Sequence, residues 1–316
     1  MITGKRFVVT GGAGFIGSNI VAKLVKNNND VIVIDNLLTG KVENLSDVYD
    51  KIRFVNGDIQ DLDLLKKEFS DVDYVLHQAA LPSVPRSIED PLTCNQNNID
   101  GTLKVLVAAR DSHVKRVVYA ASSSAYGDTP TLPKIEDMKP DPLSPYAITK
   151  LVGEQYCKVF YELYGLETVS LRYFNVFGQH QDLESQYGSV IPKFVTAMLK
   201  DEQPVIFGDG EQSRDFTHVY NNVEANLLAC VVQDAASMMF NIACGDRITL
   251  NELVRIINEI LCKDIEPIYA DPRPGDVKHS QADITLAQNI LGFEPKYSFK
   301  EGLQKTIEWF EKTIDF

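Results

Sequence analysis

The first 35 residues contain the feature that most restricts the fold of this chain. Arg6–Thr10 (RFVVT) has the composition of a short strand and runs into the glycine-rich segment TGGAGFIG at Thr10–Gly17. A helical pattern follows, and then a second apolar strand, Val31–Ile34, that is followed by Asp35. A strand, a glycine turn, a helix, a strand and an acid in this order indicate the start of a dinucleotide-binding domain.

The spacing of the glycines explains how such a turn holds a dinucleotide. Gly11, Gly14 and Gly17 permit a tight turn, a close approach of the backbone to a pyrophosphate, and close packing of the helix on the strand. The start of the helix then supplies amide donors to the phosphates. Asp35 suits the ribose hydroxyls of NAD and would repel the extra phosphate of NADP, and no Arg or Lys follows before Lys41. The sequence therefore favours NAD.

The same alternation continues along the chain. Further short apolar runs occupy Ile52–Val55, Tyr74–His77, Arg116–Ala121 and Thr168–Arg172. Helical patterns lie between them, notably Asn98–Ser112 and Tyr146–Tyr164. This order predicts an α/β fold of Rossmann type with a doubly wound parallel sheet, whose binding sites lie beyond the carboxyl ends of the strands. Polar clusters follow four of these strands, at Gly57–Ile59, Gln78–Ala80, Ser122–Ser124 and Tyr173–Asn175.

The pattern changes after Phe177-Gly178. Loops lengthen, Pro and Gly recur, and the helical patterns at Leu250–Leu261 and Leu303–Lys312 are short. We therefore expect an NAD-binding domain at 1–176 and a smaller mixed α/β substrate domain in 177–316. Within the second half, residues 217–242 are expected to return to the first domain, through His218–Val232 and Met239–Ile242.

A tyrosine and a lysine are placed four residues apart in Tyr146-Ala-Ile-Thr-Lys150. In a helix these two side chains share one face, so the phenol and the ammonium can enter one cleft. Ser144 and Pro145 mark the start of such a helix. A nearby cation favours phenolate, so the lysine is expected to lower the pKa of the Tyr146 phenol toward neutrality. By itself the spacing is also common on solvated helices.

Composition excludes several classes of function. The formal charge of −13 and a pI near 4.9 argue against a nucleic-acid or anionic-membrane binder. The five cysteines are odd in number and lack metal-ligand spacing, which indicates reduced thiols in a cytoplasmic protein and no metal site. No secretory signal pattern is visible, and no apolar run approaches the ~20 residues of a membrane span.

Two loop arginines in the second half suit an anionic ligand. Arg214 lies in the segment GDGEQSRD and Arg273 in PRPGD. The planar guanidinium matches the geometry of phosphate oxygens, although a single loop arginine is more often a solvated surface residue. Together with a nucleotide domain, the two arginines leave a site for phosphate oxygens and a solvated surface role equally open.

These segments together carry a family resemblance. TGGAGFIG, Asp35, Gly57–Ile59, His77–Ala80, SSSAYG at Ser122–Gly127, YAITK, LRYFNVFG and PRPGD occur in order over essentially the whole chain. In this combination the chain resembles the extended short-chain dehydrogenase/reductase family. It is most similar to the branch of nucleotide-sugar 4-epimerases that act on UDP-hexoses.

The resemblance implies an isomerase with a tightly held NAD that is regenerated in each turnover. Tyr146 would exchange the proton of the sugar 4-hydroxyl while C4 exchanges hydride with the nicotinamide. Lys150 would hold the nicotinamide ribose, and Ser122 would hydrogen-bond O4. The implied cofactor residues are Gly11, Gly14, Phe15, Ile16, Gly17, Asp35, Asn36, Thr39, Gly40, Asp58, Ile59, Gln78, Ala79, Ala80, Tyr146, Lys150 and Tyr173. The implied substrate residues are Ser123, Ser124, Asn175, Val190, Val205, Phe207, Arg214, Arg273, Asp276 and Ser280.

Single positions separate the related activities. Nucleotide-sugar 4,6-dehydratases place an Asp-Glu pair where this chain has Ser123 and Ser124, so a lyase is disfavoured. UDP-glucuronate-specific relatives need a cation for the carboxylate, whereas Gln179–Asp182 offers an acid. A scaffold that binds NAD without catalysis is disfavoured because Ser122, Tyr146 and Lys150 are all present.

The position that sets specificity at C2 in this family is occupied by Ser280. A tyrosine there excludes a 2-acetamido group and a small residue admits it. SVPRSI at Ser83–Ile88 also resembles the branch that prefers N-acetylated sugars. The resemblance thus favours a UDP-N-acetylglucosamine 4-epimerase that forms UDP-N-acetylgalactosamine. A UDP-glucose 4-epimerase, or an enzyme that accepts both sugars, stays open.

Two further expectations come from the resemblance. Relatives dimerise by pairing two long helices into a four-helix bundle, so a homodimer through Asn98–Ser112 and Tyr146–Tyr164 is expected. The segment Thr217–Asn222 departs from the family pattern, since Tyr220 and Asn221 stand where aspartates are usual. The sequence offers no physical reason for this change.

Overall fold

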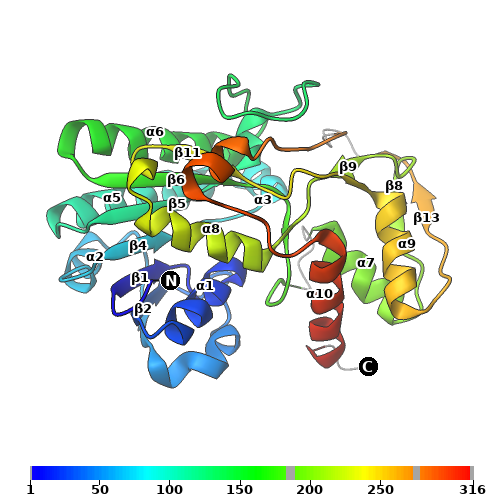
Figure 1. The fold of residues 1–316 in the computed structure, drawn as a ribbon, viewed down its shortest axis with the longest axis horizontal. Helices are drawn as coiled ribbons and strands as arrows, with labels where there is room; N and C mark the ends of the chain where they lie inside the picture. The colour runs from blue at the N-terminus through cyan, green and yellow to red at the C-terminus, as the bar shows by residue number, and fades with distance from the viewer. Residues whose placement is uncertain (1, 183–188, 273–277, 314–316) are drawn as a thin grey trace.

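The centre of the molecule is a parallel sheet of seven strands, in the order β11-β6-β5-β4-β1-β2-β3 (Figure 1). The computed structural model describes residues 2–182, 189–272 and 278–313. The strands are β1 (Arg6–Thr10), β2 (Asp30–Asp35), β3 (Arg53–Asn56), β4 (Tyr74–His77), β5 (Arg116–Ser122), β6 (Glu167–Tyr173) and β11 (Met239–Ile242). The predicted doubly wound parallel sheet is confirmed, and the predicted strand ends agree within one residue.

Helices cover both faces of this sheet because its strands are apolar on both sides. Phe7 and Val9 of β1 pack in one cluster with α1 and α8, whereas Val8 packs in another with α2, α5 and α6. Successive side chains of a strand point to opposite faces, so a continuous apolar run such as FVV needs cover on both. The helices are α1 (Phe15–Lys26), α2 (Leu62–Glu68), α5 (Gly101–Asp111), α6 (Pro145–Tyr164) and α8 (Val219–Val231).

The long helix α6 has clear start and stop signals. The Ser144 hydroxyl accepts from the Ala147 amide at 3.1 Å, and Pro145 occupies the first turn. Both features stabilise a helix start, because they satisfy or remove amides that lack helical partners. Gly165 ends the helix with a φ of 70°, which glycine adopts without strain. The helix therefore begins one residue before the predicted Tyr146 and ends at the predicted Tyr164.

The helix predicted at Asn98–Ser112 is part of a longer helical run. It follows α3 (Val84–Glu89) and consists of α4 (Pro91–Asn95), a π-helical turn at Gln96–Asp100, and α5. Asp90 caps the start, since its side chain accepts from the Thr93 amide at 3.0 Å. The polar residues of α4 and the π-turn lack an amphipathic pattern, which is why the sequence did not predict this part.

A smaller lobe lies beside the carboxyl edge of the sheet and holds the C-terminal end of the described chain (Figure 1). Its core contains Ile191, Leu253 and Phe310. Its helices are α7 (Val190–Leu199), α9 (Leu250–Leu261) and α10 (Phe299–Thr313), and its two-stranded sheets are β8 (Val205–Phe207) with β13 (Ile268–Ala270) and β9 (Ser213–Arg214) with β12 (Ile248–Thr249). Between the lobes lies the pair β7 (Val176–Phe177) and β10 (Thr217–His218). Short helical turns complete the chain: η1 (Val42–Lys51), η3 (Ser123–Tyr126), η4 (Gln233–Ala235) and η5 (Ala287–Leu291).

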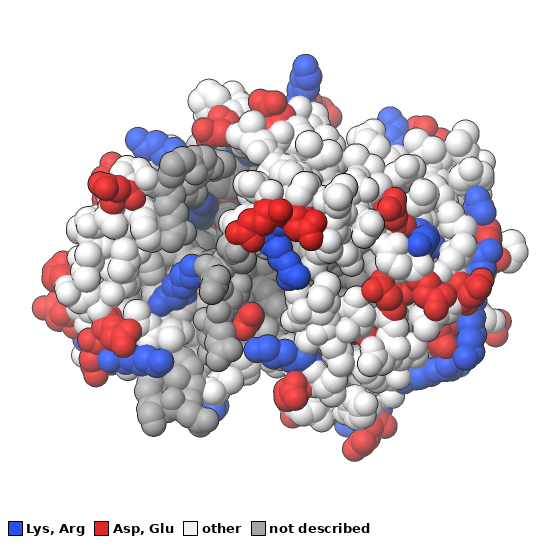
Figure 2. Space-filling model, turned by 180° about the vertical axis from the view of Figure 1, so that it is seen from behind, with Lys and Arg blue, Asp and Glu red and all other residues white. Residues whose placement is uncertain are grey.

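The surface carries both signs of charge. In the view from behind, acidic and basic side chains are interspersed over both lobes (Figure 2). In the part of the chain that the structure describes, none of the helices combines the length and the apolar character needed to cross a bilayer.

Candidate active site

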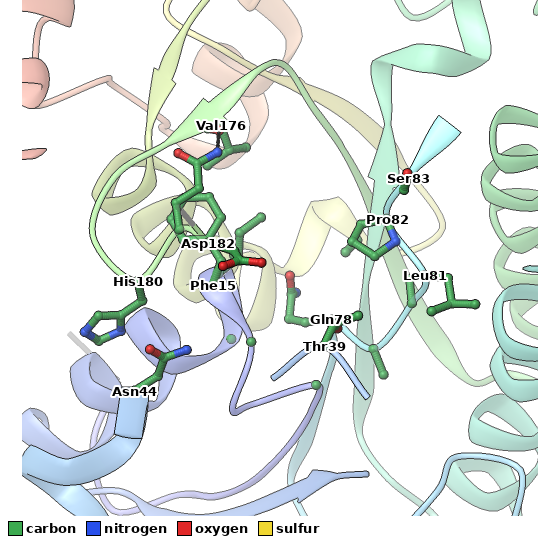
Figure 3. Close-up of a pocket in the computed structure, with 18 of the residues that line it drawn as sticks. Phe15, Thr39, Asn44, Gln78, Leu81, Pro82, Ser83, Val176, His180 and Asp182 are labelled. Atoms are coloured by element: carbon green, nitrogen blue, oxygen red, sulfur yellow. Dashed lines mark hydrogen bonds between the residues drawn. The ribbon is translucent and has the colours of Figure 1, made fainter. Parts of the chain in front are cut away.

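A large cavity of about 1570 Å³ follows the carboxyl ends of β1, β2, β4, β5 and β6. Figure 3 shows Pro82 and Ser83 on one side of it and His180 and Asp182 on the other, with Gln78 between them. The two sides come from segments about a hundred residues apart in the chain. The cavity lies where ligands bind in open α/β sheets.

The glycine turn after β1 leaves no room for side chains. A Cβ on Gly11 would stand 2.6 Å from the Ala79 amide nitrogen, and one on Gly17 would stand 2.1 Å from the Gly11 carbonyl oxygen. Gly11 also has a φ of 67°, in the left-handed region that favours glycine. The helix α1 starts at this turn without a side-chain cap and without an acid in its first turn. Its first amides therefore suit a pyrophosphate, and the turn fits NAD.

Asp35 fixes the loop on the adenosine side of this turn. Its carboxylate accepts from the Ala13 amide at 2.9 Å and from the Leu37 amide at 2.8 Å. Burial raises the pKa of Asp35, and the two amides oppose that rise. A buried carboxylate with these two amide partners keeps acceptor capacity for ribose hydroxyls. This arrangement fits NAD better than NADP.

Ser122, Tyr146 and Lys150 meet at the wall of the cavity. Ser122 ends β5, and the other two lie one turn apart on α6. The Tyr146 amide donates to the Ser87 hydroxyl at 3.1 Å, which fixes the start of α6 against α3. Ser122 lies beside the Tyr146 phenol, and the Ser124 hydroxyl donates to the Ser122 hydroxyl at 2.9 Å. These contacts hold a hydroxyl and a phenol together, as proton exchange with a substrate hydroxyl requires.

The prediction that Lys150 lowers the pKa of Tyr146 is wrong for the protein alone. Burial raises the pKa of the Tyr146 phenol to about 12, and the hydrogen bond to Ser122 opposes the rise only in part. Burial also lowers the pKa of the Lys150 ammonium to about 8. The Lys150 Nζ donates to the Ala120 carbonyl at 2.8 Å and lies 6.0 Å from the Tyr146 ring centroid. Desolvation therefore outweighs the nearby cation.

A buried histidine connects elements that carry the site. His77 Nδ1 lies 2.7 Å from the Thr10 hydroxyl, and Nε2 lies 2.9 Å from the Thr102 hydroxyl. Burial lowers the pKa of His77 to about 3, so the ring is neutral. The Thr102 hydroxyl donates to the Asn98 carbonyl, so Nε2 must carry the hydrogen and Thr10 must donate to Nδ1. No sequence pattern indicated this network, which connects β1, β4 and α5.

Gln78 and Tyr173 are joined through α8. The Asn226 amide donates to the Tyr173 hydroxyl at 2.8 Å and accepts from the Gln78 amide at 3.1 Å. The Tyr173 hydroxyl is also 3.3 Å from Gln78 Oε1. The side chain of Gln78 is thus hydrogen-bonded to protein neighbours, while the residue still lines the cavity.

Most of the predicted site residues come together in this cavity. Those that line it are Gly11, Gly14, Phe15, Ile16, Gly17, Asp35, Asn36, Thr39, Ile59, Gln78, Ala79, Ala80, Ser122, Tyr146, Lys150, Tyr173 and Asn175. Gly40, Asp58, Ser123, Ser124, Val190, Val205, Phe207, Arg214 and Ser280 do not line it. Arg273 and Asp276 lie outside the described residues. Their roles stay predictions.

Some of the residues outside the cavity act on those inside it. Asp58 accepts from the side-chain amide of Asn36 at 2.8 Å, and Gly40 packs against the carboxylate of Asp35. Val205, in contrast, is 41% exposed on β8.

Several cavity residues were not predicted. Arg86 lies on α3, and Ser83 is the residue before that helix. Both are in the SVPRSI segment, which carried a family resemblance but no assigned role. Lys41 and Asp182 form an ion pair of 3.4 Å across the cavity, and His180 hydrogen-bonds Ser18 at 2.8 Å. These pairs join residues more than 140 positions apart, so no local pattern could have indicated them.

The structure explains the unusual Asn221. Its Oδ1 accepts from the Lys296 and Tyr297 amides at 2.9 and 3.1 Å, while its Nδ2 donates to the Tyr297 carbonyl at 2.9 Å. An aspartate could not make the last bond, since an ionised carboxylate only accepts. Tyr220 packs edge-on against His218 and tilted against Tyr297. Both residues therefore hold the segment that leads into α10.

Comparison with known proteins agrees with this geometry. The profile of the NAD dependent epimerase/dehydratase family matches residues 7–243. A UDP-N-acetylglucosamine 4-epimerase of Methanobrevibacter ruminantium, solved with UDP-N-acetylmuramic acid, is 46% identical with a TM-score of 0.95, and the match covers 99% of this chain and 100% of that one. A UDP-glucose 4-epimerase of Thermotoga maritima, solved with UDP-glucose, is 41% identical with a TM-score of 0.93 over 98% and 100% of the chains. A provisionally named UDP-glucose 4-epimerase of Methanocaldococcus jannaschii is 43% identical over 96% of this chain and 98% of its own length.

Proposed function

The chain belongs to the NAD dependent epimerase/dehydratase family and is a UDP-sugar 4-epimerase that uses NAD, and we propose that it interconverts UDP-N-acetylglucosamine and UDP-N-acetylgalactosamine. The observation that carries the choice of sugar is the small side chain of Ser280. Its amide donates to the Ser213 carbonyl at 3.0 Å, so its backbone is fixed beside β9 and Arg214. In this family, a small residue at this position admits a 2-acetamido group. The 46% identical relative named for the N-acetylated sugar supports the same choice.

The roles of the protein's own residues follow from the site. Tyr146 exchanges the proton of the sugar 4-hydroxyl, and Ser122 holds that hydroxyl and the phenol in line. Lys150 binds the nicotinamide ribose and keeps a positive charge near the phenol. NAD, when bound, supplies the hydride acceptor and donor for C4 and a further positive charge beside Tyr146. The residues thus position the sugar and move its proton.

The two lobes divide this work. We infer that residues 1–176, together with 217–242, hold NAD, and that the rest of 177–316 holds the UDP group. The turn after β1 and Asp35 support the first assignment. Arg214 on β9 supports the second, because its guanidinium already lies against the Lys278 carbonyl at 3.2 Å, next to the segment that carries Ser280.

The decisive assay compares two sugars side by side, UDP-N-acetylglucosamine and UDP-glucose, without added NAD. We expect faster turnover of the N-acetylated sugar with the cofactor that the protein retains. Faster turnover of UDP-glucose would keep the epimerase and overturn the substrate. That outcome is the second candidate, because the Thermotoga maritima and Methanocaldococcus jannaschii relatives bear the name UDP-glucose 4-epimerase. Inactivity toward both, even with NAD added, would favour UDP-glucuronate or a non-catalytic scaffold.

The variant Ser280→Tyr should reverse this preference. A tyrosine fills the space for the acetamido group, so kcat/KM for UDP-N-acetylglucosamine should fall by about 10–200-fold, as one pocket contact of ~1–3 kcal/mol allows. Turnover of UDP-glucose should change little. Ser280→Ala is the matched control, since it keeps a small side chain. Normal turnover of the N-acetylated sugar by Ser280→Tyr would contradict the role of this position.

We also propose that the protein is a homodimer in which the helices at 98–112 and 146–164 of two chains pair. Ile148, Val159 and Leu163 are 48%, 39% and 69% exposed, and their helical spacing places them on one face. Such a face suits pairing with the same helix of a second chain. Sedimentation should give a mass of about twice 35.3 kDa. The mass of one chain would refute the dimer.

A further inference from the structure

The segment 278–283, which carries Ser280, is hydrogen-bonded on both sides. On one side, the Ser213 amide donates to the Lys278 carbonyl and the Ser280 amide donates to the Ser213 carbonyl, both at 3.0 Å. On the other side, the Lys134 amide donates to the Gln281 carbonyl and the Asp283 amide to the Lys134 carbonyl, both at 2.8 Å. The position of Ser280 is therefore set by β9 and by the loop that contains Lys134.

A buried carboxylate joins this segment to a third part of the chain. Asp215 directly follows β9 and is fully buried. Its Oδ2 accepts from the Ala282 amide at 3.1 Å and from the Gly245 amide at 3.0 Å. Its Oδ1 accepts from the Cys244 amide at 3.0 Å. One side chain thus holds two segments that lie about 30 and 67 residues away in the sequence.

The three partners are all donors, which explains why the residue is an aspartate. An asparagine offers one acceptor oxygen, so its amide group would face at least one of the main-chain N–H groups. No ion pair with Asp215 is found within the described ranges 2–182, 189–272 and 278–313. The three amide dipoles therefore stabilise the ionised form of the carboxylate. Burial raises the pKa of Asp215 to about 7, and the three amides oppose that rise.

We propose that Asp215 is a positioning residue for substrate: it places Ser280 and Arg214 against the UDP-sugar. This inference rests on the proposed function. Arg214 precedes Asp215 in the chain and its guanidinium donates to the Lys278 carbonyl at 3.2 Å, so Arg214 contacts the same segment that carries Ser280. Asp215 does not line the cavity that holds the proposed catalytic residues. Replacement of Asp215 should therefore weaken substrate binding and leave the rate of the chemical step unchanged.

The test compares Asp215→Asn with Asp283→Asn in the purified enzyme with its NAD. Asp283 lies in the same segment, but its carboxylate accepts from the nearby Thr285 amide at 2.7 Å at an exposed position. Because this substitution loosens the segment that carries Ser280, Asp215→Asn should raise KM for UDP-N-acetylglucosamine and Kd for UDP by about tenfold, which corresponds to ~1.4 kcal/mol. Its kcat and NAD content should change little, and Asp283→Asn should behave as the wild type.

A purely structural role would give a different pattern. A loss of NAD or a fall of kcat in Asp215→Asn, with KM and the Kd of UDP unchanged, would overturn the proposal. Equal effects of Asp283→Asn would also overturn it. If Asp215→Asn does not fold, Gln281→Ala tests the same connection, because Gln281 Nε2 donates to the Gly245 carbonyl at 2.9 Å. A rise of KM and of the Kd of UDP is again expected, and unchanged values would overturn the inference.

The outcome is separable from that of the proposed function. A wild-type enzyme that prefers UDP-glucose would contradict the proposed substrate alone. The rise of KM in Asp215→Asn is then expected for UDP-glucose, and the Kd of UDP, which has no sugar, should rise in either case. An unchanged Kd of UDP would overturn the positioning role whichever sugar is the substrate.

Discussion

Replacement of Tyr146 by phenylalanine should lower kcat by about 10²–10⁴-fold while NAD stays bound, as loss of a general acid–base group does. Phenylalanine keeps the ring and removes only the hydroxyl that lies beside Ser122. The residues of the glycine turn and Asp35 are unchanged, so cofactor content should match the wild type. Turnover is measured with UDP-N-acetylglucosamine, and NAD is measured after its release from denatured protein.

Tyr156→Phe is the matched control for this prediction. Tyr156 lies on the same helix but packs partly buried in the cluster between the sheet and α2, α5 and α6. The Tyr156→Phe variant should keep the activity of the wild type. Near-normal turnover by Tyr146→Phe would contradict the proton-exchange role, and loss of NAD from that variant would point to a structural role instead.

The second large effect is expected from Glu154→Gln. Glu154 of α6 and Arg172 of β6 form a buried pair with two bonds, from Nε at 2.8 Å and from Nη2 at 2.7 Å. Both side chains are at most 5% exposed, and Arg172 also packs over the ring of Tyr126 at 4.5 Å. Removing one partner leaves a buried charge without compensation, so the free energy of unfolding should fall by about 3–5 kcal/mol. Denaturant unfolding with NAD at saturation measures the change.

Two further variants test whether the loss of stability comes from the buried ion pair. Glu162→Gln breaks an exposed pair with Lys158 on the same helix and should change stability far less, because exposed pairs contribute little. The double variant Glu154→Leu with Arg172→Met should recover much of the loss, since it removes both buried charges. A small effect of Glu154→Gln would contradict the idea that the pair holds α6, and with it Tyr146, on the sheet.

The order of short strands and helices determined much of the fold. The runs at residues 6–10, 74–77 and 239–242 form β1, β4 and β11 with the predicted ends, and the pattern at 250–261 forms α9. These predictions succeeded because alternation and helical periodicity are local properties of neighbouring residues. The helical run from Pro91 was missed in part, because its mostly polar residues carry no helical periodicity of apolar side chains.

The candidate site was predicted to a similar degree. Glycines, Asp35, Ser122, Tyr146 and Lys150 were found because their types and spacing carry the chemistry, and the fold gathers them in one cavity. The pKa of Tyr146 was predicted in the wrong direction, since spacing shows a nearby lysine but not the burial of both groups.

The sequence by itself determined the fold class and the cofactor, because each depends on residue types at short, fixed spacing, and its resemblance to a family indicated the type of reaction. The tertiary structure alone decided which distant residues meet: Lys41 with Asp182, Asn221 with Tyr297, and Asp215 with Ala282. It also decided how far each ionisable group is buried. Hydrogen bonds and desolvation act through space, over separations of up to 141 residues in these pairs, and no local pattern in the chain records them.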